Sequence, residues 1–169
     1  MLNKYLLQLM LSKGIGEVAL KKIINTFPVS EWKQLCENPR MLNEIISCRN
    51  GTVESVFLNK DRAEKLYLKL QQNDILMILE SDENYPKQLK DSLGNKCPPL
   101  LFVKGNANLL SSTSVGFCGS RKASEKGLDI TAQCAAQLVQ KGISVVSGYA
   151  VGTDTAAHLS AIENGGNTI

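Results

Sequence analysis

A strand–helix–strand pattern in the second half of the chain limits what it can fold into. Two short apolar runs, SVGFCG (114–119) and ISVVSG (143–148), flank a longer stretch that ends at Gly142. Within that stretch, apolar and small side chains recur at helical spacing: Leu128, Thr131, Ala132, Ala135, Leu138 and Val139. A glycine is typical of a helix end. Strands joined by a crossover helix pair in parallel, so the pattern predicts an α/β fold.

The pattern starts again immediately. SGYAVGTD (147–154) follows the second run, TAAHLSAIENGG (155–166) has the composition of a helix closed by glycines, and NTI (167–169) would open another strand. Two earlier apolar runs, ILMIL (75–79) and LLFVKG (100–105), are expected to be strands as well. We therefore predict an extended, mostly parallel, Rossmann-like sheet over residues 73–169. Because the sheet stops as a strand begins, it looks truncated, as in a fragment of a longer protein.

In residues 1–72 the apolar residues recur at helical spacing, in segments separated by Pro28, Pro39 and Gly51. They predict a small all-α domain. Its LSKGIGEVALKK segment (11–22) resembles a helix–hairpin–helix, as in domains of the SAM type, and Lys13, Gly14 and Gly16 could then hold a DNA phosphate. A tight helical hairpin used only for packing needs the same glycines, so both interpretations stay open.

Net charge, the length of apolar runs and the cysteine and histidine content limit which kinds of function the chain can have. The net charge is only +3, from 19 basic and 16 acidic residues, so any nucleic-acid contact must come from local placement of charge. No apolar run approaches the roughly 20 residues of a membrane helix, and no convincing signal peptide is present, which predicts a cytoplasmic protein without membrane contact. The five cysteines include no CxxC pair and His158 is the single histidine. We therefore expect reduced thiols, no metal site and no cofactor.

The segment GSRKASEKG (119–127) lies where a predicted strand passes into a helix. Ligands of open α/β sheets bind at such strand ends, beside helix N-termini. Gly119 permits close backbone approach, Ser120 offers a hydroxyl, and Arg121 offers a fork of donors suited to phosphate. Lys122 and Lys126 add charge. The spacing matches neither GxGxxG nor the Walker pattern. The alternative is a turn capped by Ser124 with solvated basic side chains.

The second strand end carries Ser147, Gly148 and Gly152, followed by Asp154, which we expect to be the N-cap of the next helix. His158 falls one turn later and is expected to support the site by packing or hydrogen bonding. Tyr149 either stacks on a base or packs at the base of the loop. No nucleophile, base and orienting group can be assembled, so no catalytic residue is expected.

Three segments together, GSRKASEKG, VVSGYAVGTDTAAH and AIENGGNTI, closely resemble the DNA-processing protein A family (DprA/Smf) in order and spacing. ENYPKQLKD, CPPLLFVKGN and ANLL extend the resemblance upstream, so that it covers about residues 75–169, and the helical part matches more loosely. The resemblance implies a Rossmann-like core that binds and protects single-stranded DNA and loads the RecA recombinase in natural transformation. It implies a binding and loading protein, not an enzyme.

By the same resemblance, Gly119, Ser120 and Arg121 occupy the family's GSR motif, and the segment 147–152 forms a neighbouring wall of a basic pocket. Val151 stands where the family often has arginine or lysine, which implies a less basic pocket. The family's surfaces for homodimerisation and for RecA are expected beyond Ile169.

Two other functions stay open. One is a nucleoside-phosphate hydrolase similar to the LOG proteins, but ENGGNTI (163–169) lacks the proline and second glycine of their PGGxGT segment. The other is a nucleotide sensor that uses the same phosphate loop. Release of a base would favour the hydrolase, and a nucleotide that binds more tightly than an oligonucleotide would favour the sensor.

Overall fold

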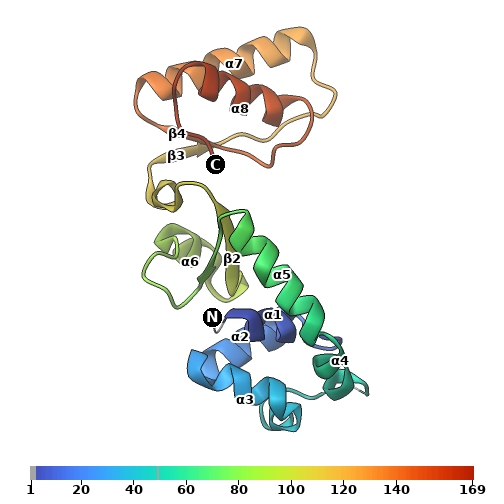
Figure 1. Ribbon diagram of the computed structural model, residues 1–169. Helices are drawn as coiled ribbons and strands as arrows, with labels where there is room; N and C mark the ends of the chain where they lie inside the picture. The colour runs from blue at the N-terminus through green and yellow to red at the C-terminus, as the bar shows by residue number, and fades with distance from the viewer. Residues whose placement is uncertain (1–2, 49) are drawn as a thin grey trace. The chain divides into compact units, whose positions relative to one another are not determined.

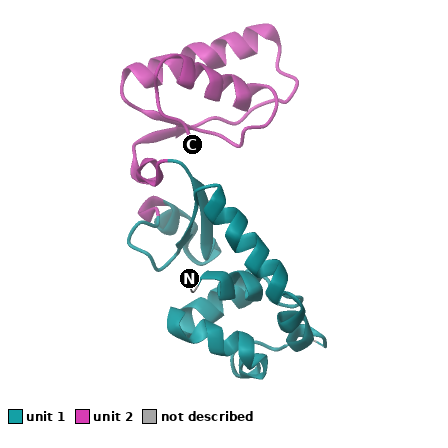
Figure 2. Ribbon diagram, in the orientation of Figure 1, with its two compact units in different colours: residues 1–85, 89–105 teal, residues 86–88, 106–169 magenta. Residues whose placement is uncertain are grey.

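The computed structural model describes residues 3–48 and 50–169. Figure 2 colours two compact units. The first, which we call the helical unit, comprises residues 1–85 and 89–105. The second, which we call the α/β unit, comprises residues 86–88 and 106–169. Each unit has its own buried core. No helix within the described residues is long and apolar enough to cross a membrane.

The helical unit begins with short helices (Figure 1), most of which contribute side chains to one buried core. They are α1 (Asn3–Met10), α2 (Glu17–Thr26), α3 (Trp32–Glu37), α4 (Thr52–Leu58) and α5 (Lys60–Gln72), with 3-10 turns at Val29–Glu31 and Pro39–Glu44. Trp32, Leu35 and Ile23 are fully buried in their common core. The Trp32 indole donates to the Phe27 carbonyl at 3.2 Å, so its polar atom is satisfied. The predicted helical N-terminal part is confirmed.

The first two predicted strands also belong to the helical unit. β1 (Ile75–Leu79) pairs antiparallel with β2 (Leu100–Lys104), with Leu79 opposite Leu100. The helix α6 (Lys87–Leu93) and a 3-10 turn (Gly94–Lys96) lie between them in the chain. Leu79 is part of the helical core, and Met77 and Leu100 pack against it. The helical unit therefore continues to Gly105, and β1 and β2 do not join the mostly parallel sheet predicted over residues 73–169, because they pair antiparallel in a sheet of their own.

The α/β unit contains the predicted crossover. After a 3-10 turn (Ala107–Ser111), β3 (Ser114–Gly116) pairs in parallel with β4 (Ser144–Val146), and α7 (Glu125–Gln140) connects them. α8 (Thr153–Glu163) follows β4 and lies beside α7 (Figure 1), and the Ser160 hydroxyl donates to the Ala132 carbonyl at 2.6 Å. The core of this unit contains Ala135, Val145, Ala157 and Ala161. The α/β fold class with a parallel strand pair is confirmed.

A third strand position is occupied at the end of the chain. Val145 forms a parallel bridge with Thr168, supported by hydrogen bonds from the Val145 amide to the Asn167 carbonyl (3.0 Å) and from the Ile169 amide to the Val145 carbonyl (2.8 Å). The prediction that residues 167–169 open another strand is confirmed. Gly142, with φ of +70°, follows the last turn of α7 as predicted. β4 is thus paired on both edges.

The cysteines differ in accessibility, which predicts their reactivity. Burial raises the pKa of the Cys36 thiol to about 12, and its Sγ lies 3.4 Å from the Tyr5 carbonyl, to which it donates. Cys118 and Cys134 are exposed. Since the thiolate is the nucleophile, iodoacetamide at neutral pH should label the exposed pair and spare Cys36. A rise in pH toward the pKa of Cys36 should increase its labelling.

Peptide mass spectrometry of the labelled chain checks this expectation, and labelling in urea provides the control in which every thiol is accessible. Equal labelling of Cys36 and Cys118 in the folded chain would contradict the burial of Cys36.

Candidate nucleic-acid interface

Two loops meet at the carboxyl ends of β3 and β4. We call residues 117–124 the GSR loop and residues 147–152 the second loop. The Phe117 amide donates to the Val146 carbonyl at 2.8 Å, and the Ser147 hydroxyl donates to the Phe117 carbonyl at 2.8 Å. The first residues of both loops are therefore fixed by the parallel strand pair. The structure brings together the two segments that the sequence predicted to form one site.

Ser120 joins the GSR loop to the start of α8. Its carbonyl accepts from both the Thr153 amide (3.2 Å) and the Thr153 hydroxyl (3.3 Å). Sequence reasoning missed Thr153. The signal that could have revealed it is its position directly after Gly152, at a predicted helix start opposite the GSR loop.

The glycines of the two loops allow this contact. A Cβ on Gly119 would lie 2.5 Å from the Thr153 hydroxyl, and one on Gly152 would lie 2.4 Å from the Ser120 carbonyl oxygen. Gly152 also has φ of +94°, where side chains are strained. A Cβ on Gly148 would lie 3.3 Å from the Asp154 carboxylate. In the structure, the close approach that Gly119 and Gly152 permit is between the two loops themselves.

Three basic side chains surround this junction on the side of the GSR loop. Arg121, Lys122 and Lys126 are all exposed, and none forms an ion pair with any residue that the structure describes. The Ser120 hydroxyl accepts from the Lys122 amide at 3.0 Å, which shapes the turn that carries them. Lys126 stands in the first turn of α7, where the helix dipole is positive. Glu125, also in the first turn of α7, is the one acidic residue between positions 117 and 127, so three cations outnumber one carboxylate there.

Ser124 is the N-cap of α7, and its hydroxyl accepts from the Gly127 amide at 3.2 Å. The turn capped by Ser124, which was the alternative to a phosphate-binding loop, is thus present. The cap uses only the Ser124 hydroxyl and leaves the basic side chains available, so a capped turn and a phosphate site are compatible here.

The expectation that Asp154 caps α8 is wrong. The helix begins at Thr153 and its N-cap is Gly152, which has no side chain to accept a bond. Asp154 is buried in the first turn, and its carboxylate accepts from the Ala150 amide at 3.4 Å. The side chain therefore folds back onto the second loop. Thr155 also holds this loop, because its hydroxyl donates to the Ala150 carbonyl at 2.7 Å.

His158 has a structural position. Its Nδ1 hydrogen-bonds with the Thr168 hydroxyl, which itself donates to the Val145 carbonyl at 3.1 Å. Since the hydroxyl has one proton, Nδ1 is the donor to Thr168. His158 is buried, and no hydrogen bond joins it to Asp154 among the described residues. The two side chains do not form an acid–base pair.

Tyr149 stands at the exposed surface of the second loop. It is 70% exposed, has φ of +55°, and its ring lies edge-on to His158 with centroids 5.6 Å apart. A positive φ is uncommon for an aromatic residue and indicates that the surrounding loop fixes it. Most of the ring surface is free to meet a ligand. Val151, two residues later, is 75% exposed.

The helical hairpin lies in the other unit. The Lys13 amide donates to the Ser55 hydroxyl at 2.8 Å, and a Cβ on Gly14 would lie 2.5 Å from the Thr52 hydroxyl. This turn therefore packs on α4. The Lys13 side chain and Gly16 are exposed. Lys21 of α2 is not free, because it pairs with Glu80 at 2.9 Å.

No cluster of histidine, cysteine or acidic residues able to hold a metal ion is found in the described ranges. The exposed side chains at the two loops comprise cations, hydroxyls, the Cys118 thiol, the Tyr149 ring and Val151. This set can bind phosphate oxygens and stack on a flat ring.

Comparisons with a family model and with known sequences point to the same protein family. The family model for DNA recombination-mediator protein A matches residues 76–169. The DNA processing protein DprA of Streptococcus pneumoniae is 37% identical over 129 residues, which are 75% of this chain and 43% of that protein. Protein Smf of Synechocystis is 28% identical over 165 residues, which are 93% of this chain and 40% of that protein.

The crystal structure of DprA from Streptococcus pneumoniae superposes with a TM-score of 0.70 at 28% identity, covering 98% of this chain and 56% of that one. The match includes both the helical and the α/β units. The chain spans less than half the length of the curated relatives named above.

Proposed function

Because this chain belongs to the DNA recombination-mediator protein A family, we propose that it binds single-stranded DNA at the GSR loop and takes part in DNA recombination. The observation that carries the proposal is the group of exposed cations at Arg121, Lys122 and Lys126, which form no ion pair with any residue of the described ranges. Arg121 and Lys122 lie on the GSR loop, which the Ser120–Thr153 contact fixes, and Lys126 lies in the first turn of α7. Cations held in place beside a helix N-terminus suit a chain of phosphates.

The second loop supplies the other part of a single-strand site. Single-strand binding combines a positive surface for phosphates with rings on which bases stack. Tyr149 is the exposed ring of the second loop, and the exposed Val151 adds apolar surface without charge. We therefore assign the phosphates to the GSR loop and one base to Tyr149.

The proposal extends to the partners of the intact protein. It would protect single-stranded DNA and deliver it to a RecA-type recombinase in the cytoplasm, as a homodimer and in natural transformation. The description of the family as a recombination mediator supports this role. We also propose that the protein is not an enzyme, because His158, the one histidine near the loops, is held by Thr168 in a structural position.

Fluorescence anisotropy of a labelled oligonucleotide tests the proposal. Lys126→Gln should weaken single-strand binding about threefold to tenfold and should reduce the slope of log affinity against log salt by about 0.7. Lys141→Gln is the matched control, because Lys141 is exposed at the C-cap of the same helix. It should leave affinity unchanged.

Competition and product analysis complete the test. Unlabelled single strands should displace the probe more effectively than duplex DNA or a nucleoside monophosphate. Preferential displacement by the monophosphate would contradict the proposal and favour a nucleotide sensor. Release of a free base from the monophosphate would contradict the statement that the protein is not an enzyme.

A further inference from the structure

A groove on the helical unit combines leucine side chains with basic ones. It encloses about 560 Å³ and is lined by Leu11 directly after α1, by Leu58 at the end of α4, and by Leu66 of α5. Leu58 is 82% exposed, the largest exposed fraction among the large apolar side chains that the structure describes. Exposed apolar surface with a polar rim is typical of interaction sites. We call this surface the leucine groove.

The rim of the leucine groove has an excess of positive charge. Arg62, Lys65 and Lys69 line it from α5, all three are exposed, and none forms an ion pair with any residue in the described ranges. Asp61 is the one carboxylate among the lining residues. Three cations against one anion favour an acidic occupant, because complementary charge directs the encounter of two surfaces.

The spacing of these cations matches the repeat of an α-helix. Arg62, Lys65 and Lys69 are separated by three and four residues, so they lie along one side of α5. With a rise of about 1.5 Å per residue, the row is about 10 Å long. A second helix with carboxylates at the same three- and four-residue spacing would present them at matching intervals along the groove.

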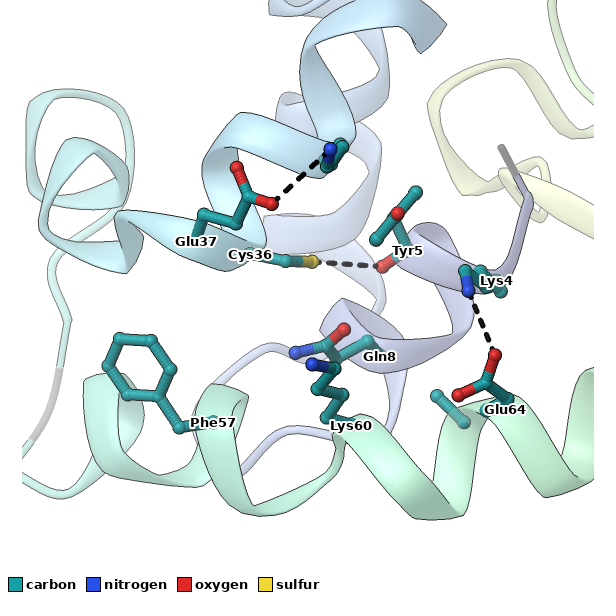
Figure 3. A pocket seen from close by; sticks show the side chains of 10 residues that line it. Lys4, Tyr5, Gln8, Cys36, Glu37, Phe57, Lys60 and Glu64 are labelled. Carbon is teal, nitrogen blue, oxygen red and sulfur yellow. Dashed lines mark hydrogen bonds and ion pairs between the residues drawn. The ribbon is translucent and has the colours of Figure 1, made fainter. Parts of the chain in front are cut away.

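The other hollow beside α5 differs in its charges. Figure 3 shows this hollow between α1, α3 and the segment formed by α4 and α5, where Lys4 pairs with Glu64 at 2.9 Å and Lys33 pairs with Glu37 at 3.6 Å. The hydrogen bond from Lys4, and then the charges of Lys4 and Lys60, lower the pKa of Glu64. The lysines of that hollow therefore have acidic neighbours within the chain, whereas the described residues supply no ion pair to the cations of the leucine groove.

The walls of the leucine groove favour a protein segment over a nucleic acid. A single strand of nucleic acid uses cations for its phosphates and aromatic rings for its bases. No aromatic residue is among the described residues that line the groove. Leucines alternating with cations instead fit a helix that has an apolar face flanked by carboxylates.

We propose that the leucine groove binds an acidic amphipathic helix of a partner protein, with the apolar side chains of that helix on the three leucines and its carboxylates on the three cations. The groove lies in the helical unit, and the proposal does not depend on the DNA site proposed at the GSR loop.

The test is a titration of the ¹⁵N-labelled chain with a synthetic helical peptide of about 16 residues that has leucines on one face and glutamates beside them. Amide chemical shifts should change most at residues 58–69 and at Leu11. Lys65→Glu and Leu58→Ser should each weaken binding about fivefold or more, because the first adds a repulsive charge and the second removes an apolar contact.

The matched controls change the same kinds of side chain outside the groove. Lys60→Glu reverses a charge at the other hollow beside α5, and Val18→Ser removes an apolar side chain that is 74% exposed on α2. At physiological salt, exposed charges more than about 8 Å apart are largely screened. Both control variants should therefore bind the peptide within about twofold of the wild type.

Three further arms interpret the result. Peptides with lysine in place of glutamate, or with serine in place of leucine, should each bind at least about fivefold more weakly. Arg121→Ala should leave the shifts at residues 58–69 intact, which separates the groove from the GSR loop. A single-stranded oligonucleotide that displaced the peptide from these residues would identify a nucleic-acid surface and overturn the proposal. Absence of shifts at residues 58–69, or equal affinity in Lys65→Glu and Lys60→Glu, would overturn it as well.

Discussion

Gly152→Ala is expected to remove about 3–5 kcal/mol from the free energy of unfolding of the α/β unit, and to abolish DNA binding with it. Two effects act together. Gly152 has φ of +94°, which a side chain tolerates poorly. The new Cβ would also lie 2.4 Å from the Ser120 carbonyl oxygen and 2.9 Å from that of Arg121. Both are backbone atoms, so the GSR loop itself must move and the Ser120–Thr153 hydrogen bonds break.

Urea unfolding followed by circular dichroism measures this loss. Gly165→Ala isolates the backbone strain, because Gly165 has φ of +72° but open space around its Cβ position, and it should cost about 1 kcal/mol. Gly116 has neither a positive φ nor an atom near its Cβ position, so Gly116→Ala should leave the free energy of unfolding nearly unchanged. Fluorescence of Trp32, the single tryptophan, reports the helical unit and should change little. Equal unfolding midpoints for the Gly152 and Gly116 variants would rule out the contact between the loops.

The parallel unit could be predicted because local signals and tertiary structure agree there. The helical spacing of 128–139, Gly142 at the helix end and the apolar run that follows specify a crossover without any long-range information. The bridge between Val145 and Thr168 shows that even the three residues NTI were enough to predict a strand.

The pairing of the first two strands could not be predicted in the same way. ILMIL and LLFVKG are short apolar runs on either side of a helix, a pattern compatible with either strand direction. Their direction and partner depend on Leu79, which packs into the core of helices far away in sequence. A single sequence contains no signal for the packing of Leu79 against residues so far away along the chain.

The sequence was enough to predict which residue types form the candidate site. It was not enough to predict the contacts between the GSR loop, the second loop and α8. A run of glycine, serine and basic residues after a strand indicates phosphate chemistry. The structure places Arg121 and Lys122 after the expected strand, exposed and without an ion pair to any described residue. Which atoms the glycines approach is decided by the neighbouring loop. Asp154 is a second example. An aspartate at a helix start is often the N-cap, but here its carboxylate accepts a hydrogen bond from the Ala150 amide in the second loop.

Arg121→Glu is expected to lower the affinity for single-stranded DNA about 100-fold at low salt, because it removes a phosphate contact and adds a repulsive charge. A factor of 100 corresponds to about 2.7 kcal/mol of binding free energy. The side chain is exposed and has no ion pair among the described residues, so the unfolding midpoint should not change. Arg121→Lys keeps the charge without the fork of donors and should lose about threefold.

The control must change net charge equally at a position in the other unit. Arg62→Glu does so on α5, where Arg62 is exposed in the helical unit. If affinity follows net charge alone, both reversals weaken binding to the same extent, and the GSR loop has no special role. If the GSR loop holds the phosphates, only the Arg121 reversal has the large effect, and the difference between the two variants shrinks as salt rises, because screening weakens the contact that Arg121 makes.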